Sequence, residues 1–274
     1  MSGIPTGADE RVRDLTGVTA EQLLALEHYP DGSDTVVFLS GSLVAGHANP
    51  WSDIDVFAIT DRAATADQQG HATTNTVATH ILENRRVDWE FWRPATVEWI
   101  ARRLGAHQLG SGESIAGASF IQIELIFMHR LRIGIPLVNE EGFRELQSQF
   151  DFDLLAAFLT EEAVRHLDAE LEDLIGMRKG NDRDVGLWVA RQVLDVSIEA
   201  YVHSTGVTDP VKKWMIKHLA ELDDSPRHRQ LREDYWRLMY PGDEASLRGG
   251  SDAWQSYAEE VIEFSNRVVA WAQG

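Results

Sequence analysis

The chain has 274 residues, of which 43% are hydrophobic, and it contains nine tryptophans and no cysteine. Its formal net charge of −19 disfavours a surface that binds nucleic acid through lysine and arginine. The absence of cysteine excludes disulfides and thiolate metal sites. No apolar run is long enough to predict a membrane span, and the N-terminal residues lack an apolar signal segment. The expected compartment is therefore the cytoplasm.

The N-terminal stretch alternates between turn signals and short ordered elements. Residues 1–17 are polar with Gly and Pro, which predicts a loose arm. Thr19 followed by Gln22 is typical of a capping box that opens a short helix. Residues 29–33 predict a turn, and the apolar, β-branched residues 36–39 then predict a buried strand.

A Gly-Ser turn and two alternating carboxylates follow this strand. Gly41 and Ser42 offer backbone N–H groups and a hydroxyl, which suit phosphate oxygens. Asp53 and Asp55 are two residues apart in a predicted strand, so both carboxylates project from the same face. Like charges held this close raise each other's pKa unless a cation lies between them, and carboxylate oxygens suit Mg²⁺. The pattern predicts a metal site beside a phosphate site.

A third carboxylate is available further along the chain. Residues 73–82 predict a strand, and residues 85–92 predict another in which apolar side chains alternate around Asp88 and Glu90. Both carboxylates lie on one face of that strand, so either one is able to complete the metal site.

The rest of the chain divides into two regions at about residue 150. The first region continues with a helix from Thr96 to Arg103, a Gly-rich loop at 105–117, helices at 120–131 and 140–149, and an edge strand at 133–138. From Phe152 onward only helical periodicity is present, ending in an aromatic stripe that is expected to form core. The expected fold class is α/β (α+β), with a mixed-sheet domain at 1–150 and a helical domain at 151–274.

These motifs together resemble a known family. Gly41-Ser42, Gly46 and the sequence Ser52-Asp53-Ile54-Asp55 resemble the signature of the DNA-polymerase-β-like nucleotidyltransferase superfamily. The Arg-Arg-aliphatic setting of Asp88 is similar to that of the family's third aspartate. The resemblance covers motifs in residues 36–92. The two-domain antibiotic (aminoglycoside-type) nucleotidyltransferases are similar in architecture, which implies that the helical domain binds substrate.

The resemblance implies specific roles. Mg²⁺ would be bound by the residues that also carry the chemistry, Asp53, Asp55 and Asp88, with Glu90 as the alternative to Asp88. The nucleotide would be bound by Gly41, Ser42 and Ser52.

Three features outside the motifs have competing interpretations. Lys213, in Lys212-Lys213-Trp214 on a helix opened by Asp209-Pro210, is a candidate to reach the triphosphate, although a solvated basic helix end is favoured. Arg191, Asp195 and Glu199 share one helical face, where an exposed, salt-bridged surface is favoured over a substrate cleft. His47 is expected to be polar surface and has no assigned role.

The expected function is Mg²⁺-dependent transfer of a nucleoside monophosphate, AMP from ATP, to a hydroxyl of a small molecule such as an aminoglycoside-like compound. The negative charge of the chain would attract a cationic acceptor. One alternative is a toxin-like enzyme that modifies tRNA or a protein, and another is a non-catalytic partner module. The negative charge disfavours tRNA, and three intact carboxylates disfavour the partner module.

Overall fold

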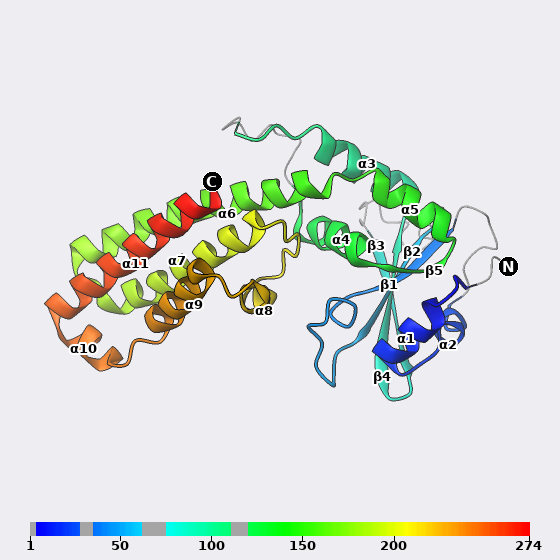
Figure 1. Cartoon of the computed structure of the whole chain (residues 1–274), viewed down its shortest axis with the longest axis horizontal. Coiled ribbons are helices and arrows are strands. Elements are labelled where there is room, and N and C mark those ends of the chain that lie inside the picture. The colour runs from blue at the N-terminus through cyan, green and yellow to red at the C-terminus, as the bar shows by residue number, and fades with distance from the viewer. Residues whose placement is uncertain (1–3, 28–34, 62–74, 111–119) are drawn as a thin grey trace, which may run out of the picture. The chain divides into compact units, whose positions relative to one another are not determined.

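The computed structural model describes residues 4–27, 35–61, 75–110 and 120–274 (Figure 1). The backbone divides into two compact units, unit 1 (residues 1–107 and 113–152) and unit 2 (residues 108–112 and 153–274). A mixed five-stranded sheet with helices followed by a largely helical region confirms the expected fold class. The assignment of functional domains at 1–150 and 151–274 stays a prediction. The predicted turn at 29–33 and part of the predicted loop at 105–117 lie outside the described residues.

Unit 1 contains a sheet with strand order β3-β4-β2-β1-β5, in which β2 and β4 are parallel and the other neighbours are antiparallel. β5 lies at an edge, as its proline predicted. The elements in chain order are α1 (Ala8–Thr16), α2 (Ala20–Leu24), β1 (Val36–Ser40), β2 (Ile54–Ile59), β3 (Asn75–Leu82), β4 (Arg85–Trp92), α3 (Pro94–Gly105), α4 (Gln122–Ile133), β5 (Ile135–Val138) and α5 (Glu140–Ser148).

Several predicted boundaries in unit 1 differ from the structure, and α4 and β5 each begin two residues later than expected. Residues 8–16 form α1 rather than a loose arm, because Ala8 and Val12 are buried in the core that includes β1 and β2. Helix α3 begins at Pro94 rather than after Thr96, because proline suits the first helical turn, where an N–H has no helical partner. The predicted capping box of α2 is confirmed, with Thr19 and Gln22 exchanging both hydrogen bonds.

The sheet of unit 1 has two differently occupied faces. Side chains such as Leu39, Val56 and Trp89 pack on one face in a core shared with α1 and α2. The opposite face carries aromatic rings, since Phe38 stacks on Phe57 with ring centroids 5.0 Å apart. Because strand side chains alternate, residues two positions along each strand from these rings project from the same face of the sheet. The predicted phosphate and metal residues lie next to the rings on this face.

Unit 2 is helical, and its described residues contain no strand. Its elements are most of α6 (Phe152–Gly180), then α7 (Arg183–Ser204), a 3-10 helix (Lys212–Trp214), α8 (Met215–Glu221), α9 (Pro226–Met239), α10 (Glu244–Gly249) and α11 (Ser251–Ala272). The aromatic stripe near the C-terminus is core, as predicted, because Trp254, Tyr257 and Phe264 are buried. Among the described residues, none of the helices has the length and hydropathy that a membrane span requires.

The packing of α7 against α11 depends on a glycine. A Cβ atom at Gly186 would lie 2.4 Å from Cζ2 of the fully buried Trp254. We therefore expect Gly186→Ala to lower the free energy of unfolding by about 1–3 kcal/mol through overpacking. Urea unfolding measures this change.

Gly176→Ala is the matched control for Gly186→Ala. Gly176 lies in α6, and a Cβ atom there would meet nothing within 4 Å. Alanine should raise the free energy of unfolding by about 0.5–1 kcal/mol at this position. Equal effects of the two substitutions would contradict the close contact between α7 and α11.

Candidate active site

The strand register brings three carboxylates to one face of the sheet. Asp55 of β2 is the Cα partner of Ser40 in β1 and of Asp88 in β4. Asp53 directly precedes β2, two residues before Asp55. Partners in neighbouring strands project from the same face, so Asp55 lies between the end of β1 and Asp88. Asp53, Asp55 and Asp88 are called the carboxylate cluster below.

Two arginines partly neutralise this cluster. Arg86 donates from Nε to Asp88 Oδ1 at 2.9 Å, and its Nη2 lies 2.8 Å from Asp88 Oδ2. The same guanidinium is 3.9 Å from Asp53 Oδ2. Arg130 of α4 approaches Asp55 Oδ2 to 3.9 Å. Thr79 of β3 adds a hydrogen bond of 2.8 Å to Asp88 Oδ1, which fixes that carboxylate from the other side.

Asp55 is the electrostatically strained member of the cluster. Burial and, to a smaller extent, the charges of Asp88 and Asp53 raise the pKa of Asp55 to about 6, although the charge of Arg130 opposes the change. Its side chain is 22% exposed, against 43% for Asp53. The negative charge of the Asp55 carboxylate is thus stabilised neither by full hydration nor by a closely paired cation.

Glu90, the alternative third ligand, has a different setting. Glu90 pairs with Phe57 of β2, and Phe57 lies two residues after Asp55 along that strand. Its Oε2 accepts hydrogen bonds from Asn75 Nδ2 at 2.9 Å and from Trp92 Nε1 at 3.4 Å. Burial raises its pKa, and the charge of Asp55 adds to that effect. The register therefore places Asp88 beside Asp55 and places Glu90 toward the aromatic layer.

The turn after β1 is shaped by its glycine. Gly41 has φ of 95°, and a Cβ atom there would lie 2.0 Å from Asp55 Oδ2. The Asp55 carboxylate therefore packs directly on the backbone at Gly41, which only glycine permits. Ser42 follows in the same turn, and its carbonyl accepts from the backbone N–H of His47 at 2.9 Å. His47 is 1% exposed, so the expectation that it is polar surface is wrong.

Ser52 has partners within its own loop. Its Oγ accepts from the backbone N–H of Asn49 at 2.9 Å, and its carbonyl accepts from Arg85 Nη2 at 3.0 Å. The hydroxyl thus shapes the turn that leads into Asp53. Its predicted contact with nucleotide stays a prediction.

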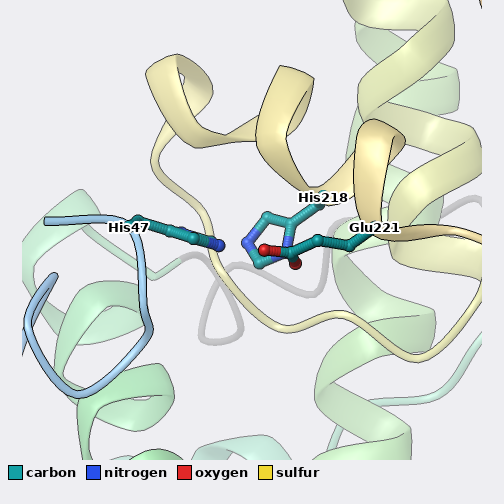
Figure 2. Close-up of side chains that lie close together, drawn as sticks. All are labelled: His47, His218 and Glu221. Atoms are coloured by element: carbon teal, nitrogen blue, oxygen red, sulfur yellow. The ribbon is translucent and has the colours of Figure 1, made fainter.

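Lys213 belongs to unit 2 and lies in the 3-10 helix, with its ammonium 4.6 Å from the ring centroid of Trp214. Lys213 lies on a helix, as predicted, but this is a 3-10 helix whose N-cap is Val211 rather than Asp209 or Pro210. Asp209 instead accepts from the backbone N–H of Val211 and lies 3.3 Å from His218 Nε2. His218 Nδ1 is also 3.4 Å from Glu221 Oε2 on the same helix, α8 (Figure 2).

The face of α7 with Arg191, Asp195 and Glu199 was predicted to be exposed and salt-bridged. Two of these residues do form ion pairs, but with other elements, Arg191 with Glu244 at 2.8 Å and Glu199 with Lys212 at 3.5 Å. Asp195 accepts a hydrogen bond of 2.8 Å from the hydroxyl of Tyr235. Asp195 is exposed, whereas Arg191 and Glu199 are partly buried, so the prediction of an exposed, salt-bridged face holds only in part.

Arg130 and Thr79 also contact the carboxylate cluster, and neither was predicted from the sequence. Arg130 follows the apolar run at the centre of α4 but is flanked by His129 and Arg132, so nothing in the sequence singled it out. Thr79 gave no signal, because threonine is common in strands and its contact with Asp88 comes from the β3–β4 pairing.

Comparison with known proteins gives a family match over part of unit 1. Residues 22–98 match the nucleotidyltransferase domain family, and this span contains Gly41 and the whole carboxylate cluster. The chain therefore carries a nucleotidyltransferase domain. No curated protein sequence matches the chain. Among solved structures it is similar to a nucleotidyltransferase-like protein from Exiguobacterium sibiricum 255-15, with 14% identity, a TM-score of 0.46, and coverage of 97% of this chain and 78% of that one.

The contact between Gly41 and Asp55 predicts a specific sensitivity. Gly41→Ala should lower the free energy of unfolding more than Gly46→Ala does. Both positions have positive φ, which costs alanine roughly 1–2 kcal/mol, but at Gly46 the Cβ would meet nothing within 4 Å. Chemical unfolding of the two variants measures the difference, and equal losses would show that Asp55 does not pack on Gly41.

The strained Asp55 predicts a pH-dependent stability. Its pKa is raised from 3.8 to about 6 on folding, so the stability it contributes is present at low pH and is lost as the pH rises through 6. Without metal, Asp55→Asn should therefore raise the free energy of unfolding by about 1–3 kcal/mol near pH 7.5, and the gain should vanish near pH 4. Asp168→Asn, at an exposed position of α6, is the control. A gain independent of pH would contradict the assigned strain.

Proposed function

We propose that the chain transfers a nucleoside monophosphate from a nucleoside triphosphate, with ATP as the expected donor, to a hydroxyl of a small-molecule acceptor. The observation that carries the proposal is the register of β2 and β4, in which Asp55 and Asp88 are partners, with the Gly41 turn against Asp55. These residues lie inside the span that matches the nucleotidyltransferase domain family.

The carboxylate cluster suits a hard divalent cation. Three carboxylates face two arginines, and Asp55 is too buried to be compensated by water. Oxygen ligands of this kind suit Mg²⁺, and the raised pKa of Asp55 is the change that a bound cation would reverse. When bound, Mg²⁺ would stabilise charge on the transferred phosphate and on the leaving pyrophosphate. We assign the metal to Asp53, Asp55 and Asp88.

The reaction assigns separate tasks to the residues of unit 1. The acceptor oxygen forms a bond to the α-phosphorus, the bond from that phosphorus to the pyrophosphate oxygen breaks, and the hydroxyl proton passes to a carboxylate. Asp88 is the proposed proton acceptor, because it lies beside Asp55. Gly41 and Ser42 would hold the terminal phosphates with backbone N–H groups.

Arg86 competes for Asp88 in this step. Its two contacts and the Thr79 hydroxyl take three of the four lone-pair directions of that carboxylate, which weakens Asp88 as a metal ligand and as a proton acceptor. The Arg86 side chain is 51% exposed, so it is able to move into water at low cost.

Two alternatives are less well supported. A tRNA acceptor would bring many phosphates to a chain with a net charge of −19, which repels a polyanion. A non-catalytic partner module would have no reason to keep a buried Asp55 that costs stability near neutral pH. Incubation with each α-labelled nucleoside triphosphate, Mg²⁺, and amine-bearing small molecules, tRNA or protein as acceptors tests the proposal. Transfer of label to the small molecules alone is the expected result.

The assignment of Asp53 and Asp55 as metal ligands predicts large losses of activity when either is substituted. Asp53→Asn and Asp55→Asn should each lower turnover by about a thousandfold or more, equivalent to about 4 kcal/mol of barrier, because each removes a charged metal ligand. Circular dichroism should show an unchanged fold for both variants. Near-native turnover of either variant would refute the assigned role of the pair.

Asp88 and Glu90 are separated by a second comparison. Asp88→Asn should abolish transfer while binding of ATP with Mg²⁺ largely survives, because Asp88 is assigned to the acceptor side. Glu90→Gln should lower turnover only modestly, since Glu90 is held by Asn75 and Trp92. Turnover and nucleotide affinity measured on both variants decide the matter. An inactive Glu90→Gln beside a nearly normal Asp88→Asn would reverse the assignment.

A further inference from the structure

The guanidinium of Arg130 lies at the turn that follows β1 in unit 1. A Cβ atom at Gly41 would lie 3.0 Å from Arg130 Nη1 and 2.0 Å from Asp55 Oδ2. Arg130 Nη2 is 3.9 Å from the same carboxylate oxygen. The guanidinium and the Asp55 carboxylate therefore lie side by side against the backbone of Gly41, where the proposed reaction places the terminal phosphates.

The packing of α4 on β1 fixes the backbone of Arg130 at this point. Ser40 Oγ donates to the backbone carbonyl of Arg130 at 2.8 Å. Gly134, which follows α4, lies so close to β1 that a Cβ atom there would be 2.6 Å from Phe38 Cδ2. The end of α4 is thus anchored to the end of β1, which keeps the guanidinium near the turn.

The described residues leave the hydrogen-bonding capacity of Arg130 unused. A guanidinium has five N–H donors, and the distance of 3.9 Å to Asp55 exceeds that of a hydrogen bond. Its N–H groups donate to no other described residue, although the side chain is only 16% exposed. Arg103, at 11% exposure, instead donates to both oxygens of Glu124 at 3.0 and 3.2 Å. Arg130 therefore has free donors in a position that water reaches only in part.

An oxyanion is the ligand that this arrangement suits. The planar fork of a guanidinium matches two oxygens of a phosphate, and such charge-assisted hydrogen bonds are among the strong ones. A phosphate bound here would lie next to the Asp55 carboxylate. The divalent cation assigned to Asp53 and Asp55 would offset the repulsion between the two anions.

The strand order places Arg130 on one side of the proposed reaction. Asp55 of β2 lies between Ser40 at the end of β1 and Asp88 of β4. Arg130 is on the β1 side, whereas Asp88, which is assigned to the acceptor, is on the β4 side. In phosphoryl transfer the attacking and leaving oxygens are roughly in line. The leaving group therefore departs on the side opposite the acceptor, which is the side of Arg130.

We infer that Arg130 binds the pyrophosphate portion of the nucleoside triphosphate and stabilises it as it leaves. The inference rests on the proposed transfer. As the acceptor oxygen bonds to the α-phosphorus, the bond from that phosphorus to the bridging oxygen breaks, and its electron pair stays on pyrophosphate. Arg130 donates hydrogen bonds to the pyrophosphate oxygens, where negative charge increases, and keeps all its protons.

Calorimetry on the full chain with Mg²⁺ tests the inference with three probes. Inorganic triphosphate and ATP contain the pyrophosphate portion, and AMP does not. Arg130→Gln should weaken binding of the first two about tenfold or more, because charge-assisted hydrogen bonds are lost, and should leave the AMP affinity within about twofold. An equal loss for AMP, an unchanged triphosphate affinity in the folded variant, or no binding of triphosphate by the unsubstituted chain would overturn the inference.

Arg132→Gln is the matched control. Arg132 lies two residues further along α4, and its guanidinium is 5.9 Å from the ring centroid of Phe152. The substitution removes the same charge from the same helix, so it reports the general electrostatic attraction of the triphosphate. The triphosphate affinity should stay within about twofold of that of the unsubstituted chain, because salt screens a charge that does not contact the ligand. Equal losses in the two variants would contradict a direct contact with Arg130.

Arg130→Lys decides the question if glutamine at this position prevents folding. Lysine keeps a positive charge near Asp55 but replaces the planar fork with a single ammonium. Inorganic triphosphate should bind about threefold or more weakly than to the unsubstituted chain, at a similar unfolding midpoint. An unchanged affinity in this variant would rule out the proposed contact.

Transfer of label from α-labelled ATP separates this inference from the proposed function. Transfer by the unsubstituted chain, together with normal triphosphate binding by Arg130→Gln, would overturn the inference alone. Weakened triphosphate binding by Arg130→Gln, without transfer by the unsubstituted chain to any of the acceptors named above, would refute the proposed function and leave Arg130 as a triphosphate ligand. Transfer by the unsubstituted chain with weakened binding by the variant is the expected result.

Discussion

The packing of the Asp55 carboxylate against the backbone of Gly41 is the constraint around which the site of unit 1 is arranged. Residue 41 must be glycine, because a Cβ atom would overlap Asp55 Oδ2. The parallel pairing of β2 and β4 then adds Asp88 beside the same carboxylate. Burying an anion next to two others is unfavourable, and Arg130 and Arg86 offset only part of the cost. The remaining strain is what a divalent cation and a triphosphate would relieve.

The local parts of this site could be predicted from the sequence. An apolar β-branched run, a Gly-Ser turn and the spacing of Asp53 and Asp55 are patterns of adjacent residues, and they identified the strands, the turn and the shared face. The capping box at Thr19 was found in the same way. These features depend on backbone conformation within a few residues, which sequence periodicity reports directly.

The parts that depend on tertiary packing could not be predicted. Arg130 reaches Asp55 because α4 covers one face of the sheet, and no spacing in the sequence relates these two residues. The register that favours Asp88 over Glu90 is likewise a property of the β2–β4 pairing. Helix α1 has a polar composition and was predicted to be a loose arm, yet a few buried apolar side chains dock it on the sheet. In unit 2, the helical period showed which side chains share a face of α7 but not which helices they contact.

The two units use the acidic composition of the chain differently. In unit 1 three carboxylates converge on one point with two arginines as counter-charges. In unit 2 several acidic side chains pair with arginine across or along helices, as Glu244 does with Arg191 and Glu259 with Arg178. Net charge alone does not distinguish a metal site from a salt-bridged surface.

The central claim is that Asp53, Asp55 and Asp88 form a divalent-metal site that acts on a nucleotide. The most direct test is a crystal structure with Mn²⁺ and a non-hydrolysable ATP analogue, in which anomalous scattering locates the metal. The account predicts a Mn²⁺ peak within bonding distance of Asp53 and Asp55, with the analogue's phosphates at the Gly41 turn and Arg86 withdrawn from Asp88. A metal and nucleotide bound elsewhere, with Arg86 still holding both oxygens of Asp88, would contradict it.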